Sequence, residues 1–444
     1  MNYTIVGAAR SGLAAASLAK ELGLTVFVTE SKTVEQMPEA KKKLTRDSID
    51  SEFGGNSEKA LLNTDCVIVS PGVPPTARIL IEAETRGIEI ISELEFAYRN
   101  CKNPIIAITG TNGKTTTTTL MAYILNRSGK KAIACGNIGS PMSAYVNHIS
   151  PDTILVAEIS SYQLDRVKTF RPDVAMILNI TPDHLSYHGS LENYISAKYK
   201  IFSMQNEKDL LILNADDAAT LAAKNHATAR IAYFSMNPVE NGIYREGEAM
   251  VARFSQHNEG KIMFFEEIRI PGVHNAYNSM AAALAARAFE IRNEDIRDSL
   301  MSFQGVEHRL ELVRTFDGID FVNDSKATNI NATWYAFSSY NRPLIWIAGG
   351  RGDNNDYSEL DELVGKNVKS IVVIGEESDN IFNHFCLKKR VQKSLSLEDA
   401  VLQAKDFAEE GDIVLFSPAC KSFDMFMNYE HRGEVFKQAV MDIK

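Results

Sequence analysis

The chain has 444 residues, a length that favours about three domains. Its 47 basic and 57 acidic residues give a net charge of −10 without a long basic run, which excludes nucleic acid and anionic membranes as expected partners. Five scattered cysteines form no C-x-x-C pair, which favours free thiols over disulfides or a zinc site. With no basic and apolar leader and no membrane-length apolar run, we expect a cytoplasmic protein without membrane insertion.

The first residues alternate between predicted strands and a predicted helix. Residues 3–12 read as an apolar strand followed by a glycine-containing turn (GAARSG), and residues 13–22 read as a helix. Two further strands end at Glu30 and Ser70. This alternation predicts a Rossmann-like beginning. A dinucleotide fingerprint would need glycine where Ala9 stands, so a nicotinamide-dependent dehydrogenase remains an alternative.

The stretch PIIAITGTNGKTTTTTLMAYIL, residues 104–125, organises the chain. An apolar, β-branched run stops at a loop with two glycines, and apolar residues then recur at helical spacing. The glycines let backbone N–H groups approach phosphate oxygens at a helix N-terminus. Lys114 would reach the outer phosphates, and Thr115 is placed to ligate Mg²⁺. The general phosphate-loop pattern has glycine where Ile108 stands, so an ordinary turn with a solvated lysine is the alternative.

Polar residues close two later apolar strands. TILVAEIS ends near Glu158, and VAMILNI runs into Asp183 and His184. Because ligands bind at the carboxyl ends of strands in open parallel sheets, these side chains are candidate ligands. An edge acid and a surface histidine are the alternatives. Lys198 and Lys200, in a helix predicted near residues 192–204, read by themselves as two solvated lysines.

The remainder shows less pattern until residue 305. Residues 205–270 hold one clear strand, LLILNAD, among short mixed segments. Asn275 precedes an alanine-rich helix and could serve as its N-cap. Strands and helices then alternate to the C-terminus, with GIDFVNDS, PLIWIAGG, SIVVIGE and DIVLFSP as strands and SLEDAVLQAKDFA as a helix. This alternation predicts another α/β domain.

Motifs across the whole chain resemble the Mur ligases and the related folylpolyglutamate synthases. T-G-T-N-G-K-T-T resembles their ATP loop, and S-P-G, E-I-S-S-Y-Q, T-P-D-H, H-N-A-Y-N, D-S-K-A-T-N and S-P-A-C-K-S-F-D follow in the family's order. The resemblance implies an α/β protein of three domains. Residues 1–94 would form a Rossmann-like domain for a UDP substrate, residues 95–305 a central P-loop-type ATPase domain, and residues 306–444 a Rossmann-like amino-acid-binding domain.

The resemblance also implies an activity. These enzymes form amides through an acyl phosphate made from ATP. Within the family, the chain looks most like the branch that adds D-glutamate to UDP-N-acetylmuramoyl-L-alanine in peptidoglycan precursor synthesis. We expect a monomer that acts on these small molecules. A sister ligase for another amino acid or for folate is an alternative, as is a nucleotide-binding module without ligase chemistry.

Roles at the ATP end are carried over position by position. The resemblance assigns catalysis to Lys114, Glu158, His184, Lys198 and Lys326. It assigns ATP binding to Gly110, Thr111, Asn112, Gly113, Lys114, Thr115, Thr116, Asn275, Asn278, Arg309 and Asp324. Two Mg²⁺ ions would be held by Thr115, Glu158, His184 and Lys198. Lys198 matches a lysine that CO₂ carbamylates in several family members, which would give it oxygen donors.

Roles at the other two substrates follow in the same way. The UDP substrate would contact Arg10, Ser11, Glu30, Ser31, Lys32, Ser70, Pro71, Gly72, Asn137, Ser160 and Gln163. D-Glutamate would contact Thr328, Arg351, Ser422 and Tyr429. Relatives commonly place a basic residue where this chain has Asp353. Arg351, two residues earlier, is the candidate replacement, and an exposed turn in which it meets only water is the alternative.

Overall fold

The computed structural model describes residues 1–254 and 257–444, which divide into two compact units. The first unit contains residues 1–268 and 277–303, and the second contains residues 269–276 and 304–444. Within the described ranges, no helix is long and apolar enough to cross a membrane.

The first sheet is parallel throughout, as the Rossmann-like prediction requires. Its strands lie in the order β3-β2-β1-β4-β5. Their bounds are β1 (Asn2–Val6), β2 (Thr25–Glu30), β3 (Asp50–Phe53), β4 (Cys66–Val69) and β5 (Glu89–Ser92). The crossovers carry α1 (Arg10–Glu21), α2 (Pro38–Arg46), the short 3₁₀ helix η1 (Glu58–Leu61) and α3 (Arg78–Thr85). Helix α1 starts three residues before the predicted position, so Arg10 stands in its first turn.

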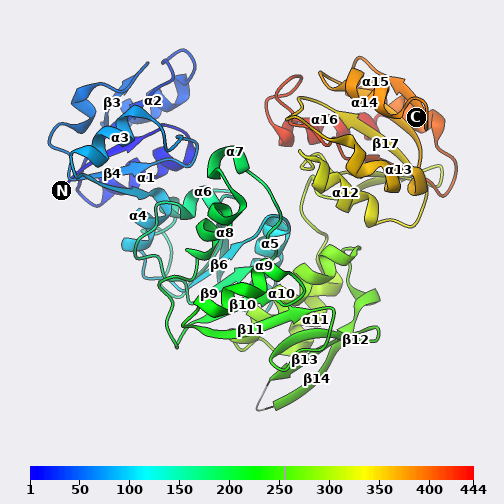
Figure 1. Ribbon diagram of the computed structural model, residues 1–444, viewed down its shortest axis with the longest axis horizontal. Coiled ribbons are helices and arrows are strands. Elements are labelled where there is room, and N and C mark those ends of the chain that lie inside the picture. The colour runs from blue at the N-terminus through cyan, green and yellow to red at the C-terminus, as the bar shows by residue number, and fades with distance from the viewer. Residues whose placement is uncertain (255–256) are drawn as a thin grey trace. The chain divides into compact units, whose positions relative to one another are not determined.

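The second sheet has nine strands in the order β14-β13-β12-β11-β10-β9-β6-β8-β7. The strands are β6 (Ile105–Thr109), β7 (Ala132–Gly136), β8 (Ile154–Glu158), β9 (Val174–Ile177), β10 (Leu210–Asn214), β11 (Arg230–Ser235), β12 (Gly242–Glu246), β13 (Ala249–Phe254) and β14 (His257–Phe264). The strands from β12 to β14 pair antiparallel and extend the sheet at one edge (Figure 1). They account for much of the segment 205–270 that the sequence pattern left unexplained.

The part of the chain that contains this second sheet also forms helices. They are α4 (Glu93–Arg99), α5 (Lys114–Arg127), α6 (Ser161–Leu164), α7 (Leu185–His188), α8 (Leu191–Tyr199), α9 (Ala218–Ala222), α10 (Val273–Ala288) and α11 (Asn293–Ser302), with 3₁₀ helices η2 (Met142–Ala144), η3 (Ala223–His226) and η4 (Phe265–Glu267). The interpretation of Asn275 as an N-cap is wrong, because α10 begins two residues earlier. Its side-chain amide instead donates to the carbonyl oxygen of Pro271 at 2.7 Å.

The second unit is built on a six-stranded sheet in the order β15-β16-β20-β17-β18-β19, in which only β15 pairs antiparallel. Its strands are β15 (Glu311–Phe316), β16 (Ile319–Asn323), β17 (Leu344–Gly349), β18 (Val368–Ile374), β19 (Arg390–Lys393) and β20 (Ile413–Phe416). Its helices are α12 (Ile330–Ser338), η5 (Tyr357–Leu360), α13 (Asp361–Asn367), α14 (Ser378–Phe385), α15 (Leu397–Phe407) and α16 (Tyr429–Met441).

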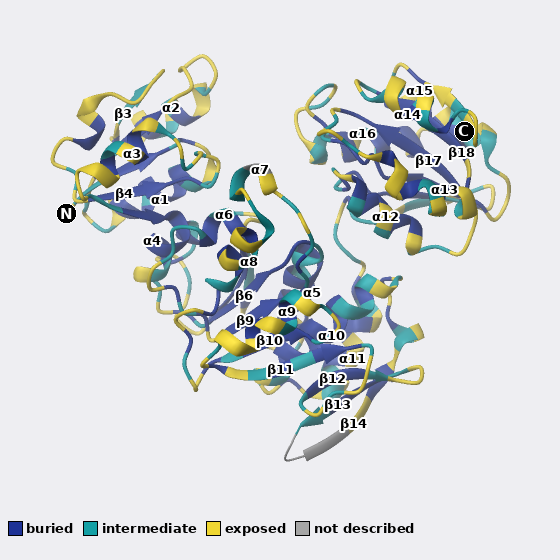
Figure 2. Ribbon diagram, in the orientation of Figure 1, coloured by how far each residue is buried: buried dark blue, intermediate teal, exposed yellow. Residues whose placement is uncertain are grey.

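Buried strands make the core of each sheet, as Figure 2 shows by their dark blue colour. In the second unit Trp346 is fully buried on β17 and meets Phe337 and Phe385 edge-on, with ring centroids 5.1 and 5.8 Å away. Such aromatic contacts stabilise beyond the area they bury. Near-continuous apolar strands are typical of parallel sheets covered on both faces.

A buried carboxylate at the start of α4 ties it to the segment before β9. Glu95 is fully buried and accepts backbone N–H bonds from Lys168, Thr169 and Phe170 at 2.9–3.1 Å. The Thr169 hydroxyl donates to it at 2.6 Å, and the Arg99 guanidinium donates at 2.9 Å. Burial acts to raise the pKa of Glu95, but these donors outweigh burial and hold it below its usual range.

We expect Glu95→Gln to lower the free energy of unfolding of the first unit by about 2 kcal/mol at neutral pH, since it removes a charge that several donors require. Because the folded-state pKa of Glu95 is depressed, this contribution is present above the unfolded pKa and fades as pH falls through the folded value. The difference between wild type and variant should therefore shrink in acid. Urea unfolding followed by circular dichroism measures it.

Glu84→Gln is the matched control, because the Glu84 side chain is 52% exposed where it accepts from Arg166. Exposed pairs contribute about 1 kcal/mol or less. Equal losses in the two variants at neutral pH would contradict the role given to Glu95.

Candidate active site

The glycine loop between β6 and α5 has the conformation that the sequence predicted. Gly110 and Gly113 have φ values of +155° and +83°, which favour glycine. A Cβ on Gly113 would lie 2.3 Å from the side-chain oxygen of Asn278, so the loop backbone packs directly on that amide. The Lys114 ammonium donates to the carbonyl oxygens of Gly110 and Thr111 at 2.9 and 2.8 Å. The loop thus holds its lysine against its own backbone.

The threonine run that follows is explained by burial. Thr115, Thr116, Thr117 and Thr118 are each no more than 8% exposed, on the first turns of α5. The Thr117 hydroxyl donates to the Asn278 side-chain oxygen at 3.2 Å, which joins α5 to α10. Short side chains with a hydroxyl suit this crowded position, although threonine has a low helix propensity.

Asn179 is a loop-holding residue that the sequence analysis missed. Its carbonyl oxygen accepts from the backbone N–H of Thr111 at 2.9 Å, and its side-chain oxygen accepts from that of Asn112 at 2.8 Å. Its own amide donates to the Asn112 carbonyl oxygen at 3.1 Å. An asparagine near the end of the apolar run VAMILNI was the available signal. The neighbouring strand end therefore fixes the loop from outside.

Lys198 is buried, so its interpretation as a solvated lysine is wrong. It is 1% exposed, and its ammonium donates to the Gly110 carbonyl oxygen at 2.8 Å. The nitrogen lies 4.5 Å from the centre of the Tyr194 ring. Burial, and next the positive charge of Lys114, lower the pKa of Lys198 well below its usual range. Lys200, by contrast, is partly exposed and pairs with Asp165 at 3.2 Å.

Glu158 closes β8 with an unsatisfied oxygen. The side chain is 2% exposed, and one oxygen accepts from the Asn137 amide at 2.8 Å. Its other oxygen is buried and has no hydrogen-bond partner among the described residues. A buried carboxylate oxygen left in this way suits a hard cation such as Mg²⁺, which prefers oxygen ligands.

His184 lies in an aromatic cluster at the start of α7. Its backbone is left-handed, with φ +53°, and its ring lies 5.0 Å from that of Tyr162. Its Nδ1 is 3.5 Å from an Asp183 carboxylate oxygen. Tyr162 also meets Tyr187 edge-on at 4.4 Å, and burial raises the pKa of Tyr187 to about 12. The ring of His184 is thus held among tilted and edge-on aromatic rings.

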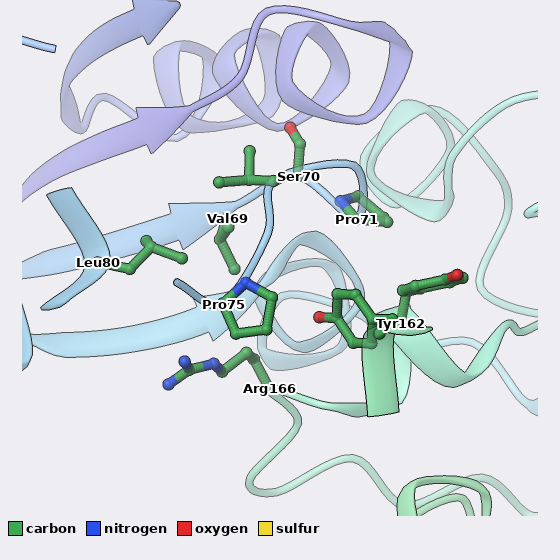
Figure 3. Close-up of a pocket in the computed structure, with 9 residues that line it drawn as sticks. Val69, Ser70, Pro71, Pro75, Leu80, Tyr162 and Arg166 are labelled. Carbon is green, nitrogen blue, oxygen red and sulfur yellow. The ribbon is translucent and has the colours of Figure 1, made fainter. Parts of the chain in front are cut away.

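The predicted substrate turn faces the same cluster. Figure 3 shows Ser70 and Pro71, just after β4, opposite Tyr162 of α6 and Arg166 beyond it. They line a cavity of about 10 Å³, room for one water-sized group. Ser160 and Gln163 form a capping box on α6, since the Ser160 backbone N–H donates to the Gln163 side-chain oxygen at 3.0 Å. Local structure accounts for both of these side chains.

The first loop of the N-terminal sheet is held by Glu30. This buried carboxylate accepts from the backbone N–H of Ala8 at 2.7 Å and from that of Lys32 at 2.9 Å. Ser31 donates its hydroxyl to the same carboxylate at 3.2 Å, whereas Arg10 and Gly72 are exposed. The structure thus brings the predicted UDP-substrate residues of both loops to one edge of the sheet.

In the second unit, the D-S-K-A-T-N motif begins with a buried acid. Asp324 is 2% exposed and accepts from the Ser417 hydroxyl at 2.9 Å. Burial raises its pKa to about 6. The Lys326 ammonium lies 5.4 Å from the centre of the Tyr429 ring, and both residues were predicted to meet substrate. Two other predicted contact residues of this unit, Arg309 and Thr328, are partly exposed.

Arg432 joins the two C-terminal motifs. It is fully buried, and its guanidinium donates to the Ser325 hydroxyl and carbonyl oxygens at 3.1 and 2.7 Å. It also donates to the Cys420 carbonyl oxygen at 3.0 Å. Burial lowers the pKa of Arg432 to about 10. The sequence analysis gave this arginine no role, because nothing in the pattern marks it as buried.

The predicted amino-acid side of the site carries two ion pairs. Arg351 bonds Glu376 in a bidentate manner at 2.8 and 3.0 Å, and Lys421 donates to Asp353 at 2.8 Å. Arg351 and Lys421 face each other in a β-bridge, next to the buried Ser422. The alternative in which Arg351 meets only water is wrong. Two cations therefore stand side by side here.

Three family models match the chain in succession. Residues 1–92 match "Mur ligase MurD-like, N-terminal domain", residues 108–286 match "Mur ligase middle domain", and residues 308–420 match "Mur ligase, glutamate ligase domain". The chain belongs to the Mur ligase family. The three-domain α/β architecture expected from its motifs is confirmed by these matches and by the three sheets.

Individual Mur ligases extend the comparison. UDP-N-acetylmuramoylalanine--D-glutamate ligases of Salinibacter ruber and Chloroherpeton thalassium are each 42% identical, over 98% and 99% of this chain and 97% of their own. Among solved structures, the UDP-N-acetylmuramate-alanine ligase of Thermotoga maritima aligns over 100% of both chains with a TM-score of 0.64 and 20% identity. A pseudomurein peptide ligase from Methanothermus fervidus gives 0.60 at 17%. These two structures support the fold.

We expect Arg432→Lys to lower the free energy of unfolding of the second unit by about 3 kcal/mol, because an ammonium cannot reach all the acceptors of the guanidinium fork. Both tryptophans, Trp334 and Trp346, belong to this unit, so tryptophan fluorescence during urea unfolding reports on it alone. Arg390→Lys, at the exposed first residue of β19, is the control and should change little. An unfolding transition of Arg432→Lys at the same urea concentration as in the wild type would contradict the stabilising role given to Arg432.

Proposed function

We propose that this chain joins D-glutamate to UDP-N-acetylmuramoyl-L-alanine and converts ATP to ADP and phosphate. The observation that carries the proposal is 42% identity, over nearly the full length, to ligases named for this reaction. The glycine loop with its inward lysine supports ATP as the energy source. Peptidoglycan precursor synthesis is the corresponding process, and we place it in the cytoplasm, where the five free cysteines are stable. We propose a monomer with domains 1–94, 95–305 and 306–444.

We propose that ATP phosphates bind the loop formed by Gly110, Thr111, Asn112, Gly113, Lys114, Thr115 and Thr116. Support comes from the backbone conformation of the two glycines and from the helix N-terminus that follows them. We also propose Asn275, Asn278, Arg309 and Asp324 as contacts of ATP. Asn278 already packs on the loop, which supports its place there.

The residues present fit the binding of Mg²⁺. The unsatisfied oxygen of Glu158 and the buried Thr115 offer oxygen donors, and His184 and Lys198 are proposed to serve a second ion. Bound Mg²⁺ would neutralise phosphate charge during transfer. Lys198 suits carbamylation, since its depressed pKa favours the neutral amine that reacts with CO₂. We propose that this carbamate forms.

The other two substrates are assigned to the loops at the sheet edges. For the UDP substrate we propose Arg10, Ser11, Glu30, Ser31, Lys32, Ser70, Pro71, Gly72, Asn137, Ser160 and Gln163. For D-glutamate we propose Thr328, Arg351, Ser422 and Tyr429. Glu30 and Ser160 already hold local structure, so substrate contacts there would add to existing hydrogen bonds.

The reaction follows as two displacements. A carboxylate oxygen of the substrate bonds to the γ-phosphorus of ATP and the bond to ADP breaks, with Lys114 neutralising the charge that develops. The D-glutamate amine then attacks the acyl carbon, loses a proton, and phosphate leaves with the electron pair of the C–O bond. Lys326 is proposed to hold the acyl phosphate in place. Positioning and charge neutralisation do most of the work.

Phosphate release tests the reaction directly. With UDP-N-acetylmuramoyl-L-alanine and ATP present, release should require D-glutamate and not other D- or L-amino acids. Lys114→Ala should lower turnover by orders of magnitude while the fold persists, and exposed Lys130→Ala should not. Release with another acceptor alone would favour a sister ligase, and none at all would favour a nucleotide-binding module.

A second test addresses Lys198. Lys198→Ala should be inactive, and added acetate or propionate should restore part of the turnover by supplying oxygen donors. Lys200→Ala, two residues away and paired with Asp165, should turn over normally. Normal turnover in Lys198→Ala, or a loss that no carboxylate rescues, would count against the carbamate.

A third test concerns the amino-acid side. Arg351→Ala should raise KM for D-glutamate about tenfold or more, because a charge-assisted contact is lost, with KM for ATP little changed. Lys421→Ala is the parallel variant, because Lys421 lies across the β-bridge and is bound by Asp353. An unchanged KM in Arg351→Ala with a raised one in Lys421→Ala would move the role to Lys421.

A further inference from the structure

A second hollow lies apart from every residue proposed for the ligase reaction. It measures about 420 Å³, within the range of small-molecule pockets, and opens between η1 and α3 beside the N-terminal sheet. Helix α3 is labelled in the blue part of Figure 1. None of the described residues that line the hollow belongs to the proposed ATP, UDP-substrate or D-glutamate contacts.

The hollow combines an apolar floor with charges of both signs. Leu61 and Ile79 line it and are each 5% exposed, so the small part of each that faces the hollow is aliphatic. Arg78 contributes a cation at the first residue of α3, while Glu58 and Glu82 contribute acids. A complementary ligand needs an aliphatic body and both charges.

Within the part of the chain that the structure describes, the cation and one of the acids have no ion-pair partner. Among the described residues, neither Arg78 nor Glu58 forms an ion pair within 4 Å, whereas Glu82 is paired with Arg86. Arg78 can therefore take a carboxylate from a ligand in a bidentate manner, and Glu58 can take an ammonium group. These are the two charged ends of a free amino acid.

The same lining disfavours nucleotides. No aromatic side chain occurs among the described residues around the hollow, so a base has nothing to stack on. One arginine beside two acids is also a poor match for a polyphosphate, because the acids repel it. A dicarboxylic amino acid would bring the same repulsion at Glu58.

We propose that this hollow binds a free neutral amino acid or a short aliphatic peptide, with its carboxylate on Arg78 and its ammonium on Glu58. The aliphatic side chain would cover Leu61 and Ile79. The ligand would be bound and not consumed, since the hollow contains none of the groups assigned to phosphate transfer. This site goes beyond the proposed ligase function and does not depend on it.

Isothermal titration of the full chain with L-leucine, without nucleotide, tests the proposal. We expect saturable binding, with acetate and ethylamine at least about tenfold weaker because each meets only one charge. Arg78→Gln and Glu58→Gln should each weaken L-leucine binding by about tenfold or more. Arg46→Gln, which removes a cation that is 73% exposed at the end of α2, should bind as wild type.

Ligase turnover serves as a second readout. Arg78→Gln should keep wild-type phosphate release under saturating substrates, so that loss of leucine binding is separable from any loss of the reaction. Absence of saturable leucine binding would overturn the site, as would binding that persists unchanged in Arg78→Gln.

Discussion

One backbone carbonyl oxygen accepts hydrogen bonds from two lysine ammonium groups, and the geometry of the site depends on this shared acceptor. Gly110 accepts from both Lys114 and Lys198, at 2.9 and 2.8 Å. Burial first, and then the repulsion between two ammonium groups on one acceptor, lower the pKa of Lys198 and favour its neutral amine. An anion entering the loop relieves the same repulsion at Lys114. The proposed phosphate binding and the proposed carbamate at Lys198 would both follow from this one arrangement.

Elsewhere, buried charges hold loops that apolar packing cannot fix. Glu95 gathers three consecutive backbone N–H groups, and Arg432 gathers oxygen atoms of Ser325 and Cys420. Loops expose unpaired backbone groups, and a single buried ion can satisfy several of them. The segment before β9 and the loops at Ser325 and Cys420 keep their shape through these two ions, while the strands are held by burial and ladder hydrogen bonds.

The sequence predicted the parts of the fold that repeat a pattern. The glycine loop and the apolar strands follow from local patterns, and the order of the three domains follows from the family resemblance; the structure and family matches confirm them. The antiparallel extension β12–β14 was not predicted, because short strands with mixed faces show no clear hydrophobic periodicity in the sequence. The burial of Lys198 and Arg432 was not predicted either. Charged side chains are rarely buried, and here their burial results from packing between residues that are distant in sequence. The exact contacts with substrates remain proposals.

The hydrogen bonds of the Glu95 carboxylate also determine when α4 can reach its final position during protein synthesis. Its partner Thr169 lies 74 residues further along the chain. A ribosome adding about 5–20 residues per second needs about 4–15 s to make that stretch. Until then the acid on α4 lacks the donors that hold it in the folded protein. The position of α4 is therefore fixed by a segment that is made several seconds later.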